Sequence, residues 1–190
     1  MTKKMSILLV AMLILAMAAP AVAARGAPRP GADSIAAIAI AAEGEFDELV
    51  AALVYVDKAL DAGLVDLFLN GTDQFTVFAP TDAAFLALYA ALSTELNPVE
   101  EITDLPAELV LDVLLYHVVE GRRAANSVVP PVRCREITTL LGATFMVNSD
   151  AEITDIAGQE VGIVTPNISA SNGIIHVIDT VLLPLSGDGS

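Results

Sequence analysis

The segment from Ser171 to Pro184 constrains the fold more than any other part of the chain. Asn172-Gly173 readily adopts positive φ angles at the two central positions of a tight turn, so a strand is predicted to begin there. With a period of two, the strand has Ile174, His176 and Ile178 on one face and Ile175 and Val177 on the other. Because both faces are largely apolar, the strand is expected to be buried on both sides and to end at Pro184.

The N-terminus has the features of a cleavable export signal. Lys3 and Lys4 precede an uncharged run of 14 residues from Met5 to Ala18, and Ala21-Val22-Ala23 places small residues at a cleavage site. The run is shorter than the ~20 residues of a membrane-spanning helix, and no cysteine for lipid attachment lies near the cleavage point. We therefore predict a signal peptide at 1–23, a flexible leader at 24–32, one domain at 33–186 and a tail at 187–190. The mature protein is expected to be secreted or periplasmic, with no membrane span.

Charge and cysteine content exclude several classes of partner and bond. Removal of Lys3 and Lys4 with the signal takes the formal charge from -15 to -17. Affinity for nucleic acids and anionic lipids depends mainly on Lys and Arg, so neither partner is expected. Cys134 is the only cysteine, so no intramolecular disulfide can form. No histidine or acid accompanies it at a recognisable spacing, and we interpret it as a small strand residue rather than a catalytic thiol.

Helical patterns dominate the first half of the chain and strand patterns the second. Asp33 or Ser34 can cap a first helix, Gly63 is placed to end the second, and Thr81 and Asp82 are expected to cap the helix that follows the strand at 75–78. Pro106 suits the first turn of a helix that leads to His117. Further strands are predicted at 118–119, 127–129, 135–141, 144–148, 152–156 and 160–166. This order predicts an α+β fold with a mostly antiparallel sheet.

Three segments resemble the signature blocks of the fasciclin (FAS1) domain family. They are Phe75 to Phe85 (FTVFAPTDAAF), Leu114 to Val119 (LLYHVV) and Ser171 to Pro184 (SNGIIHVIDTVLLP). The blocks occur in the family's order, and with the segments between them they cover about residues 33 to 185. The resemblance implies a wedge or β-sandwich of about seven strands with several helices packed on one side. It also implies an extracytoplasmic adhesion or interaction role, since members of the family are mostly secreted or surface-anchored and are not generally enzymes.

The resemblance also suggests binding residues. In animal members an Asp-aliphatic pair ahead of the Tyr-His motif, together with that motif, has been proposed to contact integrins. The matching residues here are Asp112, Val113, Tyr116 and His117. The segment from Tyr55 to Ala62 departs from the family pattern by lengthening a helix, which affects local geometry rather than the fold.

The residues themselves offer little catalytic or metal-binding chemistry. His117 and His176 are the only histidines, and both fall in apolar patterns, where a hydrogen-bonded structural role is expected. Asn148, Asp150 and Glu152 match the first positions of a calcium loop, but Ile153 and Gln159 occupy positions that need glycine and glutamate. We therefore predict no catalytic residue, metal or cofactor.

One cluster of charge stands out on the anionic chain. Arg122, Arg123, Arg133 and Arg135 are four of the seven basic residues that remain after cleavage. If the fold brings them together, they form a positive surface for carboxylate or sulfate groups of a polysaccharide, or for an acidic face of a second copy. The alternative is that they pair locally with acids such as Glu120 and Glu136.

The sequence favours a non-enzymatic binding module for adhesion or for association with matrix, polysaccharide or protein. Because one domain can bridge two surfaces only through two faces or self-association, a weak homo-oligomer is considered. The alternative function is a carrier of an apolar pigment or lipid in a pocket between helices and sheet, motivated by the aliphatic composition. A hydrolase is the least favoured hypothesis, since no triad or metal set is found.

Overall fold

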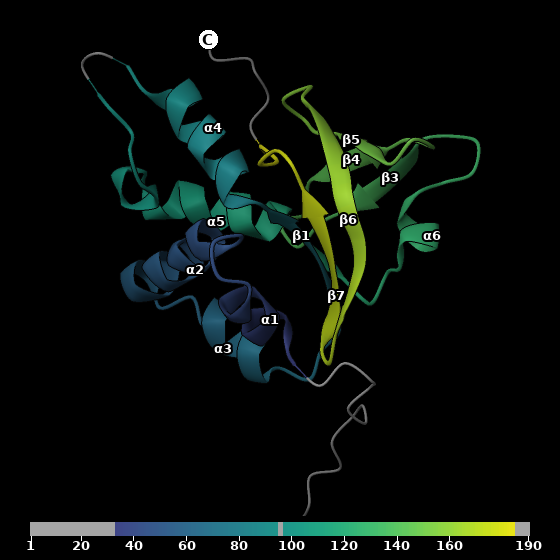
Figure 1. Cartoon of the computed structure of the whole chain (residues 1–190), viewed down its shortest axis with the longest axis horizontal. Coiled ribbons are helices and arrows are strands. Elements are labelled where there is room, and N and C mark those ends of the chain that lie inside the picture. The colour runs from purple at the N-terminus through teal and green to yellow at the C-terminus, as the bar shows by residue number, and fades with distance from the viewer. Residues whose placement is uncertain (1–32, 95–96, 185–190) are drawn as a thin grey trace, which may run out of the picture.

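The computed structural model describes residues 33–94 and 97–184, so the predicted signal peptide, leader and tail lie outside the described residues. The first five helices form a layer on one side of a seven-stranded sheet, and the short sixth helix lies on the other side (Figure 1). The helices are α1 (Ile35–Ala41), α2 (Asp47–Leu60), α3 (Leu64–Asn70), α4 (Asp82–Leu92), α5 (Ala107–Tyr116) and α6 (Ala125–Val128), with a 3-10 turn η1 at Ile102–Asp104. The strands are β1 (Phe75–Pro80), β2 (Val118–Glu120), β3 (Arg135–Thr138), β4 (Thr144–Val147), β5 (Glu152–Thr154), β6 (Glu160–Ala170) and β7 (Gly173–Ile178).

The sheet has the order β2-β1-β7-β6-β5-β4-β3. β1 and β7 are parallel, and every other neighbouring pair is antiparallel. β6 pairs with β7 on one side and β5 on the other, and it bends through irregularities between Ile163 and Ile168. The amide of Leu140, just after β3, donates to the Val118 carbonyl of β2 over 2.7 Å, which brings the two ends of the sheet together. The result is a nearly closed wedge, and it confirms the predicted α+β fold.

β7 lies in the middle of this sheet and separates two hydrophobic cores. All six of its residues are buried, as predicted for a strand covered on both sides, but the strand ends at Ile178 and not at Pro184. Ile175 and Val177 belong to the core beneath the helices, whereas Ile178 belongs to the core between the two halves of the sheet. The period of two read from the sequence therefore assigns these faces correctly.

Two helices are capped by carboxylates from other helices. The N-cap residue of α2, Phe46, has no side-chain cap, and Asp82 of α4 accepts from the Glu48 amide over 2.9 Å instead. Gly63 at the N-cap of α3 has no side chain, and Asp57 of α2 accepts from the Leu64 and Val65 amides over 2.7 and 2.8 Å. Thr81 caps α4 as predicted, and Ser34 caps α1. The prediction that Gly63 ends α2 is wrong: the C-cap of α2 is Asp61, which has a φ of 54°, and Gly63 is the N-cap of α3.

The hairpin between β6 and β7 corrects the predicted turn chemistry. Neither Asn172 nor Gly173 has a positive φ. Asn172 is buried, and its side chain accepts from the Ile35 amide over 2.8 Å and donates to the Phe68 carbonyl over 2.8 Å. A Cβ at Gly173 would overlap with the Phe75 carbonyl oxygen and lie 2.7 Å from Cδ1 of Ile35. The dipeptide is therefore required for a side-chain bridge and for space, not for its backbone freedom.

Two predicted strand segments are also corrected. Residues 127–129 contain the end of the short helix α6, whose Ala125 amide donates to Oδ1 of Asn167 over 2.7 Å. Cys134 is exposed and lies directly before β3, not in a strand. β6 continues past Pro166, because that proline falls at the irregularity between Thr165 and Ile168, where a ladder hydrogen bond is not needed.

Candidate functional site

The junction of α5 and β2 brings Tyr116 and His117 between the two cores. α5 passes directly into β2, with His117 as its C-cap residue and its backbone amide bonded to the carbonyls of Val113 and Leu114. Tyr116 belongs to the core between the halves of the sheet, whereas His117 lines a cavity beneath the helices. Adjacent residues at this junction therefore contact opposite cores.

Tyr116 connects α5 to the far half of the sheet. Its side chain is fully buried, its hydroxyl donates to the Thr144 carbonyl over 2.8 Å, and it accepts from the Ile156 amide over 3.3 Å. Its ring contacts Phe145 edge to face at 6.0 Å between centroids. Burial raises the pKa of Tyr116 to about 12. The hydroxyl therefore stays protonated at neutral pH and serves two backbone groups.

His117 connects the same junction to the C-terminal segment. Its Nδ1 lies 2.7 Å from the Val113 carbonyl oxygen, and its Nε2 lies 3.0 Å from the Leu182 amide nitrogen. A carbonyl can only accept and an amide N–H can only donate, so Nδ1 carries the proton and Nε2 accepts. Burial lowers the pKa of His117 to about 4, opposed by the hydrogen bond to Val113 and by the charge of Asp155. The imidazole is therefore neutral at physiological pH.

Asp155 completes this junction. It is 6 % exposed and accepts from the Leu183 amide over 2.9 Å, next to the Leu182 amide that His117 holds. It also accepts from the backbone and side-chain N–H groups of Gln159 over 2.9 and 2.8 Å. Sequence reasoning did not single out Asp155. The only local signal was the turn at Ala157-Gly158, which does not reveal the contact with Leu183.

His176 also has a structural role, and its side chain lies on the face of β7 opposite to that of Ile175 and Val177. It is fully buried, its Nε2 donates to the Arg123 carbonyl over 3.0 Å, and its Nδ1 accepts from the Asn167 amide over 3.3 Å. The ring lies 5.4 Å from that of Phe78. Burial lowers the pKa of His176, opposed by the hydrogen bond to Arg123. Both histidines thus use both ring nitrogens to hold backbone segments.

The four residues suggested by the family resemblance do not share one surface. Asp112 is exposed and Val113 is half-buried, while Tyr116 and His117 are buried. The Val113 carbonyl is occupied by Nδ1 of His117. Of this set, Asp112 is the side chain that a partner reaches without rearrangement.

The arginines are also distributed over different roles. The Arg122 side chain donates to the carbonyls of Ala170, at 2.9 Å, and Gly173, and to Oγ of Ser169 at 2.5 Å, which holds the β6–β7 hairpin. The Arg135 side chain donates to the Ser127 carbonyl at the end of α6. Arg123 contributes its backbone to Thr76 and His176, and Arg133 is exposed. Two of the four guanidinium groups therefore hold backbone segments.

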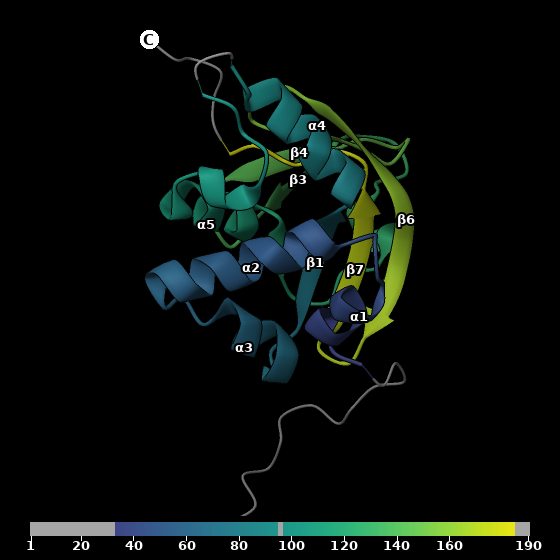
Figure 2. The same cartoon turned by 60° about the vertical axis from the view of Figure 1, so that its left-hand side comes forward.

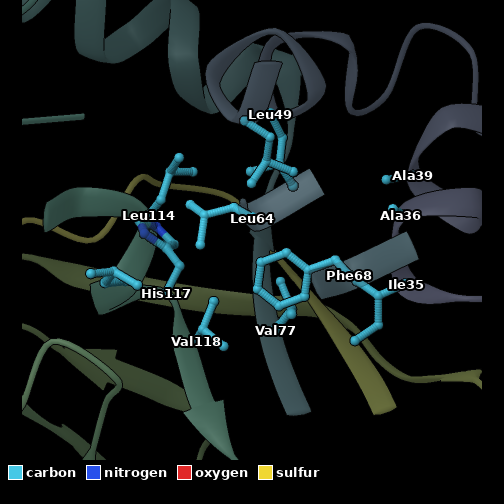
Figure 3. A pocket seen from close by; sticks show the side chains of 12 residues that line it. Ile35, Ala36, Ala39, Leu49, Leu64, Phe68, Val77, Leu114, His117 and Val118 are labelled. Atoms are coloured by element: carbon cyan, nitrogen blue, oxygen red, sulfur yellow. The ribbon is translucent and has the colours of Figure 1, made fainter. Parts of the chain in front are cut away.

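The cavity beneath the helices is apolar and small. Figure 3 shows side chains from α1, α2, α3 and α5 and from β1 and β2 converging on it, with the His117 imidazole at one side. Its volume is about 30 Å³. Pockets for drug-sized ligands have volumes of ~300 Å³ or more, so a pigment or lipid enters only if the helices move apart.

Comparison with known families agrees with this architecture. The model of the fasciclin domain matches residues 45–184. The chain belongs to the fasciclin domain family. This is a family of adhesion-related domains that are not generally enzymes.

Several known proteins are similar to the chain in sequence. Protein sll1483 of Synechocystis sp. is 36% identical over 150 residues, which cover 77% of this chain and 72% of that protein. Immunogenic protein MPB70 of Mycobacterium bovis is 34% identical over 64% of this chain and 54% of its own length. The cell surface glycolipoprotein MPB83 of the same species is 36% identical over 65% and 49%. The chain thus spans about half the length of the mycobacterial relatives.

A solved structure supports the fold. The FAS1 domain pair from the insect cell adhesion molecule fasciclin I superposes with a TM-score of 0.63 at 16% identity, over 80% of this chain and 51% of that one. Within residues 33–94 and 97–184, no helix is long and apolar enough to cross a membrane. The same residues contain no group of three or more His, Cys, Asp or Glu placed to hold a metal ion.

Proposed function

We propose that this chain is an exported, non-enzymatic fasciclin module that binds a protein or an acidic polysaccharide of the cell surface or matrix. The observation that carries the proposal is the double hydrogen bonding of His117 and His176 to backbone groups. A general base must reach a substrate proton, and these imidazoles are buried with both nitrogens occupied. The two imidazoles therefore stabilise the fold, and we assign binding to the exposed surface.

Adhesion by one domain requires two contacts. A monovalent monomer cannot bridge two surfaces, so the proposal includes either a second binding face or weak self-association. The exposed Arg133 suits an anionic group better than Arg122 or Arg135, whose side chains already hold backbone carbonyls. A test of the arginines should therefore separate Arg133 from these two.

The test is binding of the full chain to envelope and exopolysaccharide fractions of its own host, measured by biolayer interferometry. We expect saturable binding. Arg133→Ala should weaken this binding, because Arg133 is the exposed arginine that we propose for the anionic group of the partner. Arg122→Ala is expected to lower stability. The binding of this variant is therefore interpreted together with its thermal midpoint of unfolding. Absence of saturable binding to any fraction, with a strict monomer at high concentration in ultracentrifugation, would contradict the adhesion role. Turnover of a metabolite by the purified chain would contradict the non-enzymatic role.

The carrier hypothesis has less support. It needs a cavity about tenfold larger than the 30 Å³ beneath the helices. The neighbouring apolar space between α2, α4 and α5 has a volume of about 60 Å³, which is also too small for a pigment or lipid.

A further inference from the structure

The solvent-facing side of α4 carries no polar residue after its first turn. From Ala83 to Leu92 the helix reads AAFLALYAAL, and Tyr89, its one polar side chain, is buried. The exposed residues are Ala83, Leu86, Ala87, Ala90, Ala91 and Leu92. Leu86 is 59 % and Leu92 is 42 % exposed. A surface helix ordinarily turns charged residues to water, so an apolar outer face indicates a contact surface.

A groove runs along this face. It has a volume of about 160 Å³ and lies between α4, which contributes Ala87, Ala91 and Leu92, and the segment from Thr180 to Leu183. Figures 1 and 2 show α4 at the margin of the helical layer. The alanines spaced four apart, Ala83, Ala87 and Ala91, leave room for another helix to approach closely, and the leucines flank them. Groove and exposed face together form what we call the α4 face.

The charges around the α4 face are acidic. Asp82 is the first residue of α4, and its carboxylate accepts from the amide of Glu48 in α2 over 2.9 Å, so both acids lie beside the start of this helix. The exposed Glu160 and Asp179 adjoin the groove residues Gln159 and Thr180. Among the described residues that line the groove, none is basic. The Arg122 side chain binds at the Gly173 end of β7. Helix α4 lies at the other end of this strand, because it follows Pro80 of β1, which pairs with Ile178. Arg122 is therefore not part of the α4 face.

We propose that the α4 face binds an amphipathic helix of a partner protein, whose apolar side fills the groove and whose lysines or arginines meet the acidic rim. The inference rests on the proposed binding role and specifies its surface and partner chemistry. A second copy fits less well, because its own α4 face would bring a second acidic rim against the first. The chain's tail also fits poorly, since residues 185–190 read LSGDGS and contain a single apolar side chain.

The probe is an 18-residue synthetic helix with a leucine face flanked by lysines, compared with the same peptide carrying glutamates. Binding to the full chain is measured by fluorescence anisotropy at low and high salt. We expect saturable binding of the lysine peptide, at least tenfold weaker binding of the glutamate peptide, and weaker binding at high salt. The double variant Leu86→Gln and Leu92→Gln should weaken lysine-peptide binding at least tenfold. The matched control is Ile40→Gln with Val164→Gln, which changes side chains of similar exposure, 56 % and 55 %, and should change it less than twofold.

Four results would overturn the inference: no binding of the lysine peptide, equal binding by the two double variants, loss of self-association in the α4 variant, or tighter peptide binding after removal of residues 185–190. The third would assign the face to a second copy and the fourth to the tail. Both double variants are checked for an unchanged thermal midpoint. If the Leu86→Gln, Leu92→Gln variant binds the lysine peptide as tightly as the control variant does, while both still bind the envelope fractions, the α4 inference fails and the proposed function stands. If the wild-type chain binds no envelope fraction, the proposed function itself fails.

Discussion

At the scale of single residues, the fold depends on side chains that hold backbone groups far away in sequence. Asn172 bonds to residues 137 and 104 positions away, and His117 to an amide 65 positions away. Each buries a polar side chain that is satisfied by a backbone group, so loss of the side chain leaves that group unpaired. Predictions about these residues are therefore predictions about stability.

Gly173 provides the first of these tests. We expect Gly173→Ala to lower the free energy of unfolding by about 2 kcal/mol, because the added Cβ meets the Phe75 backbone and Ile35 in a packed core. Gly162→Ala is the matched control, since it also lies in a strand without a positive φ and its Cβ would meet only the end of the exposed Asp179 side chain, not backbone. Urea unfolding of the control should show that its free energy of unfolding differs from that of wild type by less than ~0.5 kcal/mol. Equal losses in the two variants would exclude the packing explanation.

His117 makes stability depend on pH. Its folded pKa of about 4 lies below the usual 6.5, so the folded state binds fewer protons than the unfolded state. The stabilisation is complete above pH 6.5 and is lost as the pH falls toward 4, by on the order of 3 kcal/mol. Burial causes this direction, and a proton on Nε2 would in addition face the Leu182 N–H, which can only donate.

The check compares wild type with His117→Phe by urea unfolding between pH 7 and pH 4. The variant should be less stable at pH 7, because the Leu182 amide loses its acceptor. The difference should narrow as the pH falls, while the titration of carboxylates affects both proteins. A constant difference over this range would mean that His117 does not titrate as described.

At the scale of helices and strands, the sequence predicted what is local. The period of two in β7 and the cap at Thr81 depend on neighbouring residues, and the structure confirms them. The strand predicted at 75–78 is longer, because Ala79 and Pro80 also pair with β7. The α6 segment was predicted as a strand because Val128 and Val129 favour one, but contacts from Asn167 and Arg135 hold it as a helix. Tyr116 and His117 were recognised as a motif, whereas their partners Thr144, Ile156 and Leu182 depend on the folded topology.

Helix α3 gives a prediction at this scale. Asp57→Ala removes the acceptor of two amides at the start of α3 and should cost about 1 kcal/mol of unfolding free energy. Hydrogen exchange should also become faster in α3 before it changes in β7, because the cap acts on the helix end alone. Asp112→Ala, at an exposed position, is the control and should leave both measurements unchanged. If α3 in Asp57→Ala were as protected from hydrogen exchange as α3 in the wild type, the capping role of Asp57 would be contradicted.

At the scale of the whole molecule, the two cores meet at Tyr116, His117 and Asp155. The helical core and the core between the halves of the sheet share β1 and β7, and the α5–β2 junction fastens both to the C-terminal segment. Because this interior is packed and hydrogen-bonded, we assign the proposed binding to the surface. The small cavity leads to one more prediction: native mass spectrometry of the chain purified from its host should give the unliganded mass. A mass increment that matches a pigment or lipid would restore the carrier hypothesis.

The most direct test of the central claim, that the Tyr-His segment is a structural junction in this chain, is the unfolding free energy of Tyr116→Phe. The account predicts a loss of about 2 kcal/mol, because the Thr144 carbonyl and Ile156 amide lose a shared partner inside the fold. The control is Tyr55→Phe, because the Tyr55 hydroxyl donates to a single carbonyl, that of Leu105, at a partly buried position. Its free energy of unfolding should fall by at most ~1 kcal/mol. An unchanged free energy of unfolding in Tyr116→Phe would contradict the claim.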